Sequence, residues 1–155
     1  MNPSSPSNER MTDARPRPIR TPYSDFFWEG ALSGRLMIQR CADCSSYQHP
    51  PGPLCTRCGS DSLVPTQVSG RGQIHSFTMV RHVFHVAFTD RVPYLLGRIE
   101  LEEQRELFLI TNIVDCAPEN VRCGAQVKVV FERRGDFALP QFTLVGLDPV
   151  SREIF

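Results

Sequence analysis

The sequence predicts a mostly β fold in which one short helix is followed by a small ribbon and then by a five-stranded barrel. Two patterns carry this prediction: a C-x-x-C motif occurs twice with ten residues between the copies, and from Gln67 onward apolar residues recur at every second position. The first pattern is typical of small ribbons that fold around a metal ion, and the second of half-buried β-strands. Hydrophobic residues make up 41% of the 155 residues, which is enough for a core in one domain of ordinary size.

Residues 1–20 are expected to form a disordered tail. They are rich in Pro, Ser, Asn and Arg and poor in apolar side chains, so ordering them would bury too little surface to offset the lost conformational entropy. The start of the chain lacks the apolar segment of a secretory signal, and no apolar run approaches the roughly 20 residues that span a bilayer. We therefore expect a cytoplasmic protein without a membrane segment.

Residues 21–35 predict a short amphipathic helix. Thr21 is suited to cap its start, Pro22 to occupy its first position, and Gly34 to adopt the left-handed conformation that ends a helix. At helical spacing one face carries the apolar residues Phe27, Trp28, Ala31 and Leu32. Two interpretations remain open. The face packs on the chain's own core, or Phe27, Trp28 and Leu32 form a surface that binds a partner.

Residues 36–64 predict a zinc ribbon whose metal ligands are Cys41, Cys44, Cys55 and Cys58. Two residues between paired cysteines let both sulfurs reach one ion from a single turn, and two such turns supply the four thiolates of a closed tetrahedral site. A closed shell leaves no position for water or substrate, so this metal is expected to be structural. Zinc is the expected ion, and iron fits the same rubredoxin-like cage. His49 is expected to be a turn residue because four cysteines already complete the shell.

Residues 65–148 are expected to form the barrel, and 149–155 a C-terminal tail. Segments with period-two alternation supply five strands, at 74–81, 95–101, 107–113, 127–131 and 142–146. Five strands with an interruption after the third suit a small barrel of the oligonucleotide/oligosaccharide-binding (OB) type. Gly70 and Gly72 open the first strand, where glycines often mark a bend that lets a long strand serve both halves of a barrel.

The segment Arg81–Phe88 joins the first two predicted strands and carries more apolar side chains than a connecting loop normally does. In a barrel of this type the loop often borders the binding face. One hypothesis is a ligand with an apolar part and a phosphate part. Its candidate binding residues are Arg71, Arg81, Phe84, Phe88 and Arg98. The alternative is that the first strand simply continues and the loop is shorter.

Charge and motif content argue against two classes of function. Seventeen basic residues balance seventeen acidic ones, and residues 65–155 hold ten basic and eleven acidic side chains, whereas nucleic-acid-binding domains are usually basic. Nucleic acid is therefore not an expected partner, although a zinc-ribbon and OB module that binds nucleic acid remains the alternative. The sequence also lacks the nucleophile-elbow, phosphate-loop and zinc-protease motifs, and the remaining Cys116 and Cys123 have no assignable base.

Taken in order, these motifs resemble a known family. The aromatic helix segment Phe26–Gly30, Gly34-Arg35-Leu36, the two C-x-x-C knuckles around Pro50-Pro51, and the Ser69–Thr78 segment have matching order and spacing. They are similar to OB-fold proteins with an N-terminal rubredoxin-like zinc ribbon, long catalogued as domain of unknown function thirty-five. The resemblance runs from about residue 22 to 148. Ser45 departs from it, because a glycine is usual there, and so does the lack of a tryptophan near Leu63.

The resemblance implies a non-catalytic accessory subunit with a metal site at the four cysteines. Members associate with thiolase-like enzymes, with aldolases of the sterol-carrier thiolase type and with enoyl-CoA hydratases, and they are implicated in binding acyl-CoA. It follows that acyl-CoA and a thiolase-like or hydratase-like subunit are the expected partners, in lipid, sterol or polyketide-type metabolism. A pure assembly scaffold that never touches substrate stays open as a further alternative.

Overall fold

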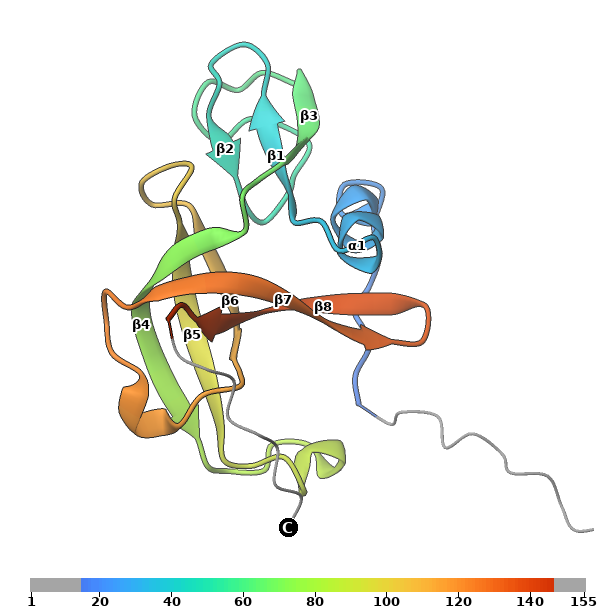
Figure 1. The fold of residues 1–155 in the computed structure, drawn as a ribbon. Helices are drawn as coiled ribbons and strands as arrows, with labels where there is room; N and C mark the ends of the chain where they lie inside the picture. Colours follow the sequence, from blue (N-terminus) through green and yellow to red (C-terminus); the bar gives the residue numbers. More distant parts are fainter. Residues whose placement is uncertain (1–14, 147–155) are drawn as a thin grey trace, which may run out of the picture.

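The structure is a computed structural model that describes residues 15–146 (Figure 1). The predicted C-terminal tail at 149–155 and the first fourteen residues of the predicted N-terminal tail lie outside the described part. Within it, one helix, a three-stranded ribbon and a closed five-stranded barrel follow one another along the chain, which confirms the predicted fold class. None of the helices in residues 15–146 is long and apolar enough to cross a bilayer.

The ribbon is an antiparallel sheet of three short strands in the order β2-β1-β3. These strands are β1 (Met37–Cys41), β2 (Tyr47–Gln48) and β3 (Leu63–Gln67). β1 pairs with β3 along its whole length, from Met37 opposite Gln67 to Cys41 opposite Leu63. β3 therefore runs three residues past the predicted end of the ribbon at residue 64.

The barrel closes in the strand order β4-β5-β6-β8-β7. Its strands are β4 (Arg71–Val80), β5 (Tyr94–Leu101), β6 (Phe108–Ile113), β7 (Gln126–Arg134) and β8 (Phe137–Leu144). Short 3-10 turns, η1 (Val86–Phe88) and η2 (Pro118–Asn120), lie in two of the connections. All neighbouring strands are antiparallel except β6 and β8, which meet in parallel at the single pair Ile113 and Phe142. The seam between β6 and β8 is therefore the weakest-paired part of the barrel wall.

A compact apolar core fills the barrel. Ile74, Ile99 and Phe142 are fully buried, and residues from every barrel strand join them, together with Phe27 of α1 and Ile38 of β1. Gly72 permits the closest approach in the wall, because a Cβ atom there would meet the backbone carbonyl oxygen of Glu100 in the neighbouring strand.

A β-bulge between Ile74 and Ser76 interrupts the pairing of β4 with β5. Up to Ile74 the even-numbered residues of β4 face the interior, and beyond the bulge Met79 pairs with the buried Leu95. Opposite residues of an antiparallel pair share a face, so the inward-facing set has switched from even to odd numbers. The uninterrupted alternation that the sequence predicts for 74–81 is therefore wrong in its second half.

The N-terminal helix, α1 (Asp25–Leu32), begins later than the sequence predicts. Thr21 does not cap it: the Ser24 hydroxyl accepts a hydrogen bond from the Thr21 backbone N–H, and Ser24 is the capping position without a side-chain cap bond. The end of the helix is as predicted, since Gly34 has a φ of 70°. α1 lies beside the β7–β8 hairpin, where that hairpin extends beyond the barrel (Figure 1).

The ribbon is attached to the barrel by polar contacts to the turn between β5 and β6. The Gln104 side chain pairs with Tyr47 of β2, accepting from its backbone N–H at 2.8 Å and donating to its carbonyl oxygen at 3.1 Å. The Glu103 carboxylate accepts a hydrogen bond from the backbone N–H of Ser69 in the linker. Gln104 therefore acts as an additional strand partner for the ribbon and fixes its position on the barrel.

Candidate functional site

The sulfur atoms of Cys41, Cys44, Cys55 and Cys58 form one cluster, with every pair within 4.8 Å. The Cys41 and Cys58 sulfurs are 3.7 Å apart, and those of Cys44 and Cys55 are 3.5 Å apart. Ligands about 2.3 Å from a tetrahedral zinc ion are about 3.8 Å from one another. The cluster therefore has the spacing of a four-thiolate site, and it is the single such group of His, Cys, Asp or Glu side chains in residues 15–146.

Each cysteine pair lies in a backbone knuckle of the same design. In the first knuckle the N–H of Ser45 bonds the carbonyl oxygen of Cys41, and in the second the N–H of Gly59 bonds that of Cys55. Both Ser45 and Gly59 are left-handed, with φ values of 62° and 77°. This conformation is easy for glycine and strained for serine, so the first knuckle carries a backbone cost that the second does not.

The electrostatics of the cluster favour a bound cation. Hydrogen bonds from the side chain and backbone of Ser46 lower the pKa of the Cys44 thiol to about 6. A backbone hydrogen bond from Ser60 acts to lower the pKa of Cys58, but hydrogen bonding with Cys44 and desolvation outweigh it and raise that pKa to about 12. Four adjacent sulfurs cannot all ionise unaided, and a divalent cation between them would stabilise the fully ionised set.

Two buried glutamines hold the loop between the knuckles. Gln39 accepts from the backbone N–H of Gly52 at 2.9 Å and donates to its carbonyl oxygen at 3.0 Å. Gln48 donates to Gln39 at 2.9 Å and accepts from the backbone N–H of Thr56 at 2.9 Å. The sequence analysis missed this network, because nothing in the sequence indicates that Gln39 and Gln48 face each other across β1 and β2.

His49 is a packing residue and lies outside the cysteine cluster. Its ring lies 5.2 Å from the ring of Phe27 in α1, and burial lowers the pKa of the imidazole to about 4. A neutral imidazole against a phenyl ring joins the helix to the ribbon, so its role extends beyond the expected turn.

Most of the predicted partner-binding face of α1 packs against the chain's own core. Phe27 is 7% exposed and belongs to the core cluster, and Trp28 packs against that cluster with its ring edge-on to Phe27 at 4.9 Å. Leu32 is half-buried. For Phe27, packing on the chain's own core is therefore the interpretation that the structure supports.

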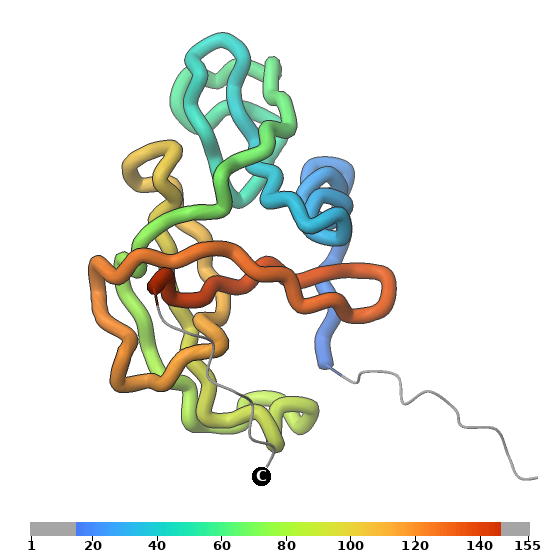
Figure 2. The backbone as a smooth tube through the Cα atoms, in the orientation of Figure 1, coloured from blue at the N-terminus to red at the C-terminus, as the bar shows by residue number. Residues whose placement is uncertain are grey.

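The predicted ligand-binding residues do not meet in one place. Arg71 opens β4 and Arg81 follows its last residue, so about 30 Å of strand separates them. Arg98 lies on the outside of β5, where its guanidinium stacks 3.7 Å from the ring centroid of Phe108. Phe84 and Phe88 share the loop after β4 with Arg81, at the end of the barrel opposite the ribbon (Figure 2). Phe84 is 81% exposed, whereas Phe88 is half-buried.

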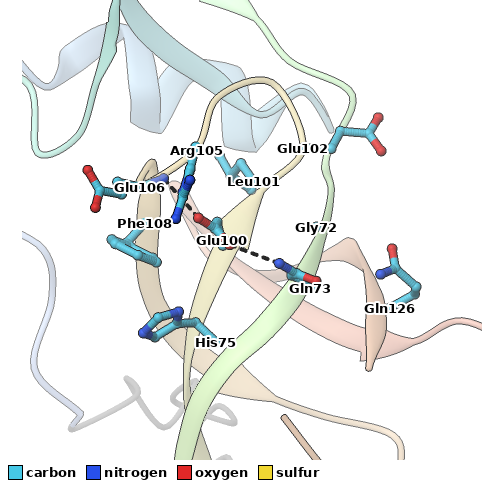
Figure 3. Close-up of a pocket in the computed structure, with 10 residues that line it drawn as sticks. All are labelled: Gly72, Gln73, His75, Glu100, Leu101, Glu102, Arg105, Glu106, Phe108 and Gln126. Atoms are coloured by element: carbon cyan, nitrogen blue, oxygen red, sulfur yellow. Dashed lines mark hydrogen bonds between the residues drawn. The ribbon is translucent and has the colours of Figure 1, made fainter. Parts of the chain in front are cut away.

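The described surface includes a smaller and a larger concave region. The smaller, of about 640 Å³, lies between β4 and the β5–β6 turn (Figure 3). Glu100 accepts hydrogen bonds there from the Glu106 backbone N–H at 2.8 Å and from Gln73 at 2.9 Å, and these bonds lower the pKa of its carboxyl group. Three glutamates, Glu100, Glu102 and Glu106, line this pocket against the single arginine Arg105, so its charge does not favour phosphate groups.

The larger region is a groove of about 1340 Å³ beside the β6–β8 seam. One wall carries Met79, Leu95 and Ile113, and the other is formed by the β7–β8 hairpin. Of the predicted ligand-binding residues only Phe88 lines it. The sequence could not indicate this groove, because its lining comes from five separated segments and each apolar residue alone resembles ordinary core.

Comparison with known proteins gives consistent results for both parts of the chain. A family profile described as the ChsH2 rubredoxin-like zinc ribbon domain matches residues 28–64, and one described as the ChsH2 C-terminal OB-fold domain matches residues 65–132. A solved structure described as "Ltp2-ChsH2(DUF35) aldolase" is similar with a TM-score of 0.74 and 36% identity, covering 83% of this chain and 98% of that one.

Two curated relatives extend the comparison. A probable enoyl-CoA hydratase alpha subunit of Thermomonospora curvata is 38% identical over 129 residues, which is 83% of this chain but 39% of that protein. A DUF35 domain-containing scaffold protein of Methanocaldococcus jannaschii is 35% identical over 99 residues, which is 63% of this chain and 68% of the relative. The chain thus spans well under half of the hydratase subunit and about two thirds of the scaffold protein.

Proposed function

The chain belongs to the ChsH2 (DUF35) family of zinc-ribbon and OB-fold proteins, and from this premise we propose that it is a non-catalytic accessory subunit. In this proposal it completes a thiolase-like, aldolase or hydratase enzyme that acts on an acyl-CoA thioester. Relatives named as a hydratase alpha subunit, a scaffold and an aldolase assembly support the choice of partner class. The free thiols that a four-cysteine site requires fit a cytoplasmic location.

The observation that carries the proposal is the closed character of the cysteine cluster. Four sulfurs at tetrahedral spacing fill the shell of a zinc ion, so the ion would fold the ribbon and hold no substrate. Zinc is the proposed ion, bound by Cys41, Cys44, Cys55 and Cys58.

The loop after β4 is the proposed partner surface. Phe84 and Val86 are each 81% exposed, a degree of exposure that is unfavourable for two neighbouring apolar side chains of a small domain. Arg81, the first residue of this loop, is exposed and could pair with acidic side chains of a partner. An enzyme surface that buried Phe84 and Val86 would gain about 1.5–3 kcal/mol for each side chain.

The test is co-expression with a thiolase-like or hydratase-like protein from the same organism, followed by copurification. We expect a stable complex, and we expect the double variant Phe84→Ser, Val86→Ser to weaken it at least tenfold. Ile110→Ser is the matched control, because Ile110 is 70% exposed but lies on β6 away from the loop. If the double variant still copurifies with the enzyme, the loop is not part of the interface. Failure of the wild-type chain to bind such an enzyme would contradict the accessory role.

The same preparation tests the nucleic-acid alternative. The balanced charge of the chain predicts no micromolar, salt-dependent binding of short oligonucleotides, measured by fluorescence anisotropy. Such binding would favour a nucleic-acid module. A complex in which the coenzyme A ligand contacts only the partner would instead favour a pure scaffold.

A further inference from the structure

Residues 15–20, which precede α1, run beside the β7–β8 hairpin and are called the strap below. Arg15 and Pro16 are among the residues that line the groove beside the β6–β8 seam, whose opposite side is formed by the barrel. Figures 1 and 2 show the segment passing from the start of α1 along the hairpin. The strap is therefore placed where it covers one side of the groove.

Two arginines of the strap pair with two acidic residues of the hairpin. Arg15 Nη1 lies 3.1 Å from Glu132 Oε1, although 117 positions separate the two residues in sequence. Their side chains are 14% and 29% exposed. Arg17 pairs with Asp136 in the hairpin turn, and its guanidinium lies 5.3 Å from the ring centroid of Phe137. The hairpin thus offers one acidic partner for each of these two arginines.

Little else attaches the strap to the hairpin. Pro16 and Pro18 have no backbone N–H, and Arg17 and Ile19 make no backbone hydrogen bond with another residue of the range 15–146. Ile19 is 87% exposed, so it buries almost no apolar surface. Ion pairs near the surface contribute little individually and are screened by salt. The strap is therefore held more weakly than the strands beside it.

The opposite end of the strap has a firmer anchor. Arg20 donates hydrogen bonds to Asp25 at 2.8 Å and to Glu29 at 3.1 Å, and both acceptors belong to α1. α1 is itself fixed by Phe27, which is 7% exposed and packs in the core. β7 and β8 are paired along the whole hairpin. If the strap is released, it pivots near Arg20 while the helix and the hairpin stay in place.

We propose that the strap is an electrostatic gate on the groove. The gate is closed while the two strap arginines pair with the hairpin, and it opens by a swing about Arg20 when those pairs are broken. Opening uncovers the part of the groove around Leu139, which lines the groove and pairs with Glu132 across the hairpin. The inference concerns this chain alone and goes beyond the accessory role without depending on it.

A thiol introduced by Leu139→Cys reports on the state of the gate. Leu139 is half-buried in the groove, whereas the native Cys123 is exposed and is not among the residues that line it. The experiment measures iodoacetamide labelling of both thiols in the full, zinc-loaded chain by peptide mass spectrometry. A covered thiol reacts through the open state, so its labelling rate relative to Cys123 follows the fraction of open molecules.

Loss of both ion pairs should open the gate. Added to the Leu139→Cys parent, the changes Arg15→Glu and Arg17→Glu should raise the relative labelling rate about fivefold at low salt, since two such pairs together favour the closed state by about this factor. About 1 M NaCl should raise the rate of the parent to a similar level and change that of the variant by less than twofold.

Arg133→Glu is the matched control for a change of net charge. Arg133 is an exposed arginine of the same hairpin and is not among the residues that line the groove. This substitution should change the relative labelling rate by less than twofold. Metal content and thermal midpoint show whether each variant is folded.

An exchange of charges tests the Arg15–Glu132 pair itself. Glu132→Arg alone should raise the labelling rate, because it places two arginines opposite each other. Combined with Arg15→Glu, it restores an ion pair of reversed polarity and should return the rate to within about twofold of the parent.

The possible outcomes either support the gate or overturn it. A labelling rate that responds neither to salt nor to the charge changes would show that the strap does not cover the groove. A rate that rises with Glu132→Arg and is not restored by Arg15→Glu would assign the effect to the lost hydrogen bond between Gln141 and Glu132, and would overturn the ion-pair mechanism. Either result leaves the accessory role standing, because no partner enzyme takes part in the measurement.

Discussion

The ribbon and the barrel bury different kinds of side chain. In the barrel the fully buried residues are apolar: Ile74, Ile99, Leu101, Val127 and Phe142. In the ribbon Leu36, Ile38 and Cys41 are at most 2% exposed, and the rest of its interior is Cys55, Gln39, Ser46 and Gln48. Burial of polar groups stabilises little by itself, so the ribbon needs a metal ion and a complete hydrogen-bond network, whereas the barrel needs neither.

Loss of one metal ligand should have the largest effect on stability of the changes considered, and the unfolding that it causes should be confined to the ribbon. Structural zinc contributes on the order of 10 kcal/mol to small ribbons, so Cys55→Ser should abolish tight metal binding. Hydrogen exchange should become fast across residues 36–67 and stay slow in the barrel strands. Metal analysis should fall from one equivalent per chain to near zero. Cys123→Ser is the control, because Cys123 is exposed and outside the cluster. Slow hydrogen exchange in a metal-free ribbon would contradict the claim that the ribbon, unlike the barrel, needs a metal ion to fold.

The converse change is a cavity in the barrel. Phe142 is 0% exposed at the β6–β8 seam, and Phe142→Ala should lower the free energy of unfolding by about 3–5 kcal/mol. Urea denaturation followed by tyrosine fluorescence and circular dichroism measures the loss. The variant should retain one equivalent of metal in the absence of urea, and loss of the metal together with the core would show that the two regions are one cooperative unit.

The contact between α1 and the ribbon should respond to pH. His49 has its pKa lowered to about 4, so the unfolded chain binds a proton between roughly pH 6.5 and pH 4 that the folded chain does not. Stability is therefore lost as pH falls through this range, by about 2 kcal/mol between pH 7.5 and pH 5. The His49→Phe variant should not show this loss of stability. Metal release at low pH affects both proteins equally, so subtracting the unfolding free energies of the variant from those of the wild type leaves the contribution of His49. Parallel pH profiles would indicate that His49 is not buried in a neutral form.

The two knuckles permit a smaller and more symmetrical test. Ser45 and Gly59 occupy equivalent left-handed positions, so Ser45→Gly should raise the thermal midpoint and Gly59→Ser should lower it. Each substitution should change the free energy of unfolding by about 1 kcal/mol. Equal shifts of the same sign would show that backbone strain does not distinguish the two knuckles.

The sequence predicted those features that depend on local spacing. The C-x-x-C pairs identified the cysteine cluster, and period-two alternation found every barrel strand, because burial on one face leaves that pattern whatever the rest of the chain does. The beginning of β8 was missed, since Pro140 interrupts the pattern, and the structure pairs it with Phe131 of β7 alone. The bulge after Ile74 was also missed, because it leaves no signal in the alternation that precedes it.

The candidate binding residues were harder to predict than the fold. The five proposed ligand residues were selected because they are arginines and aromatics near one loop, but β4 is long enough to place Arg71 and Arg81 at opposite ends of the barrel. The groove depends on strand register, which decides that Val130, Leu139 and Gln141 share a face. Register is set by contacts across the sheet and cannot be read from one strand alone.

The accessory role is tested most directly by turnover. One acyl-CoA substrate is given to the purified chain, to the partner enzyme and to their complex, and product is measured by chromatography at equal concentrations of active sites. The account predicts no product from the isolated chain and substantially more from the complex than from the partner alone. Turnover by the isolated chain at the rate of the complex would contradict it.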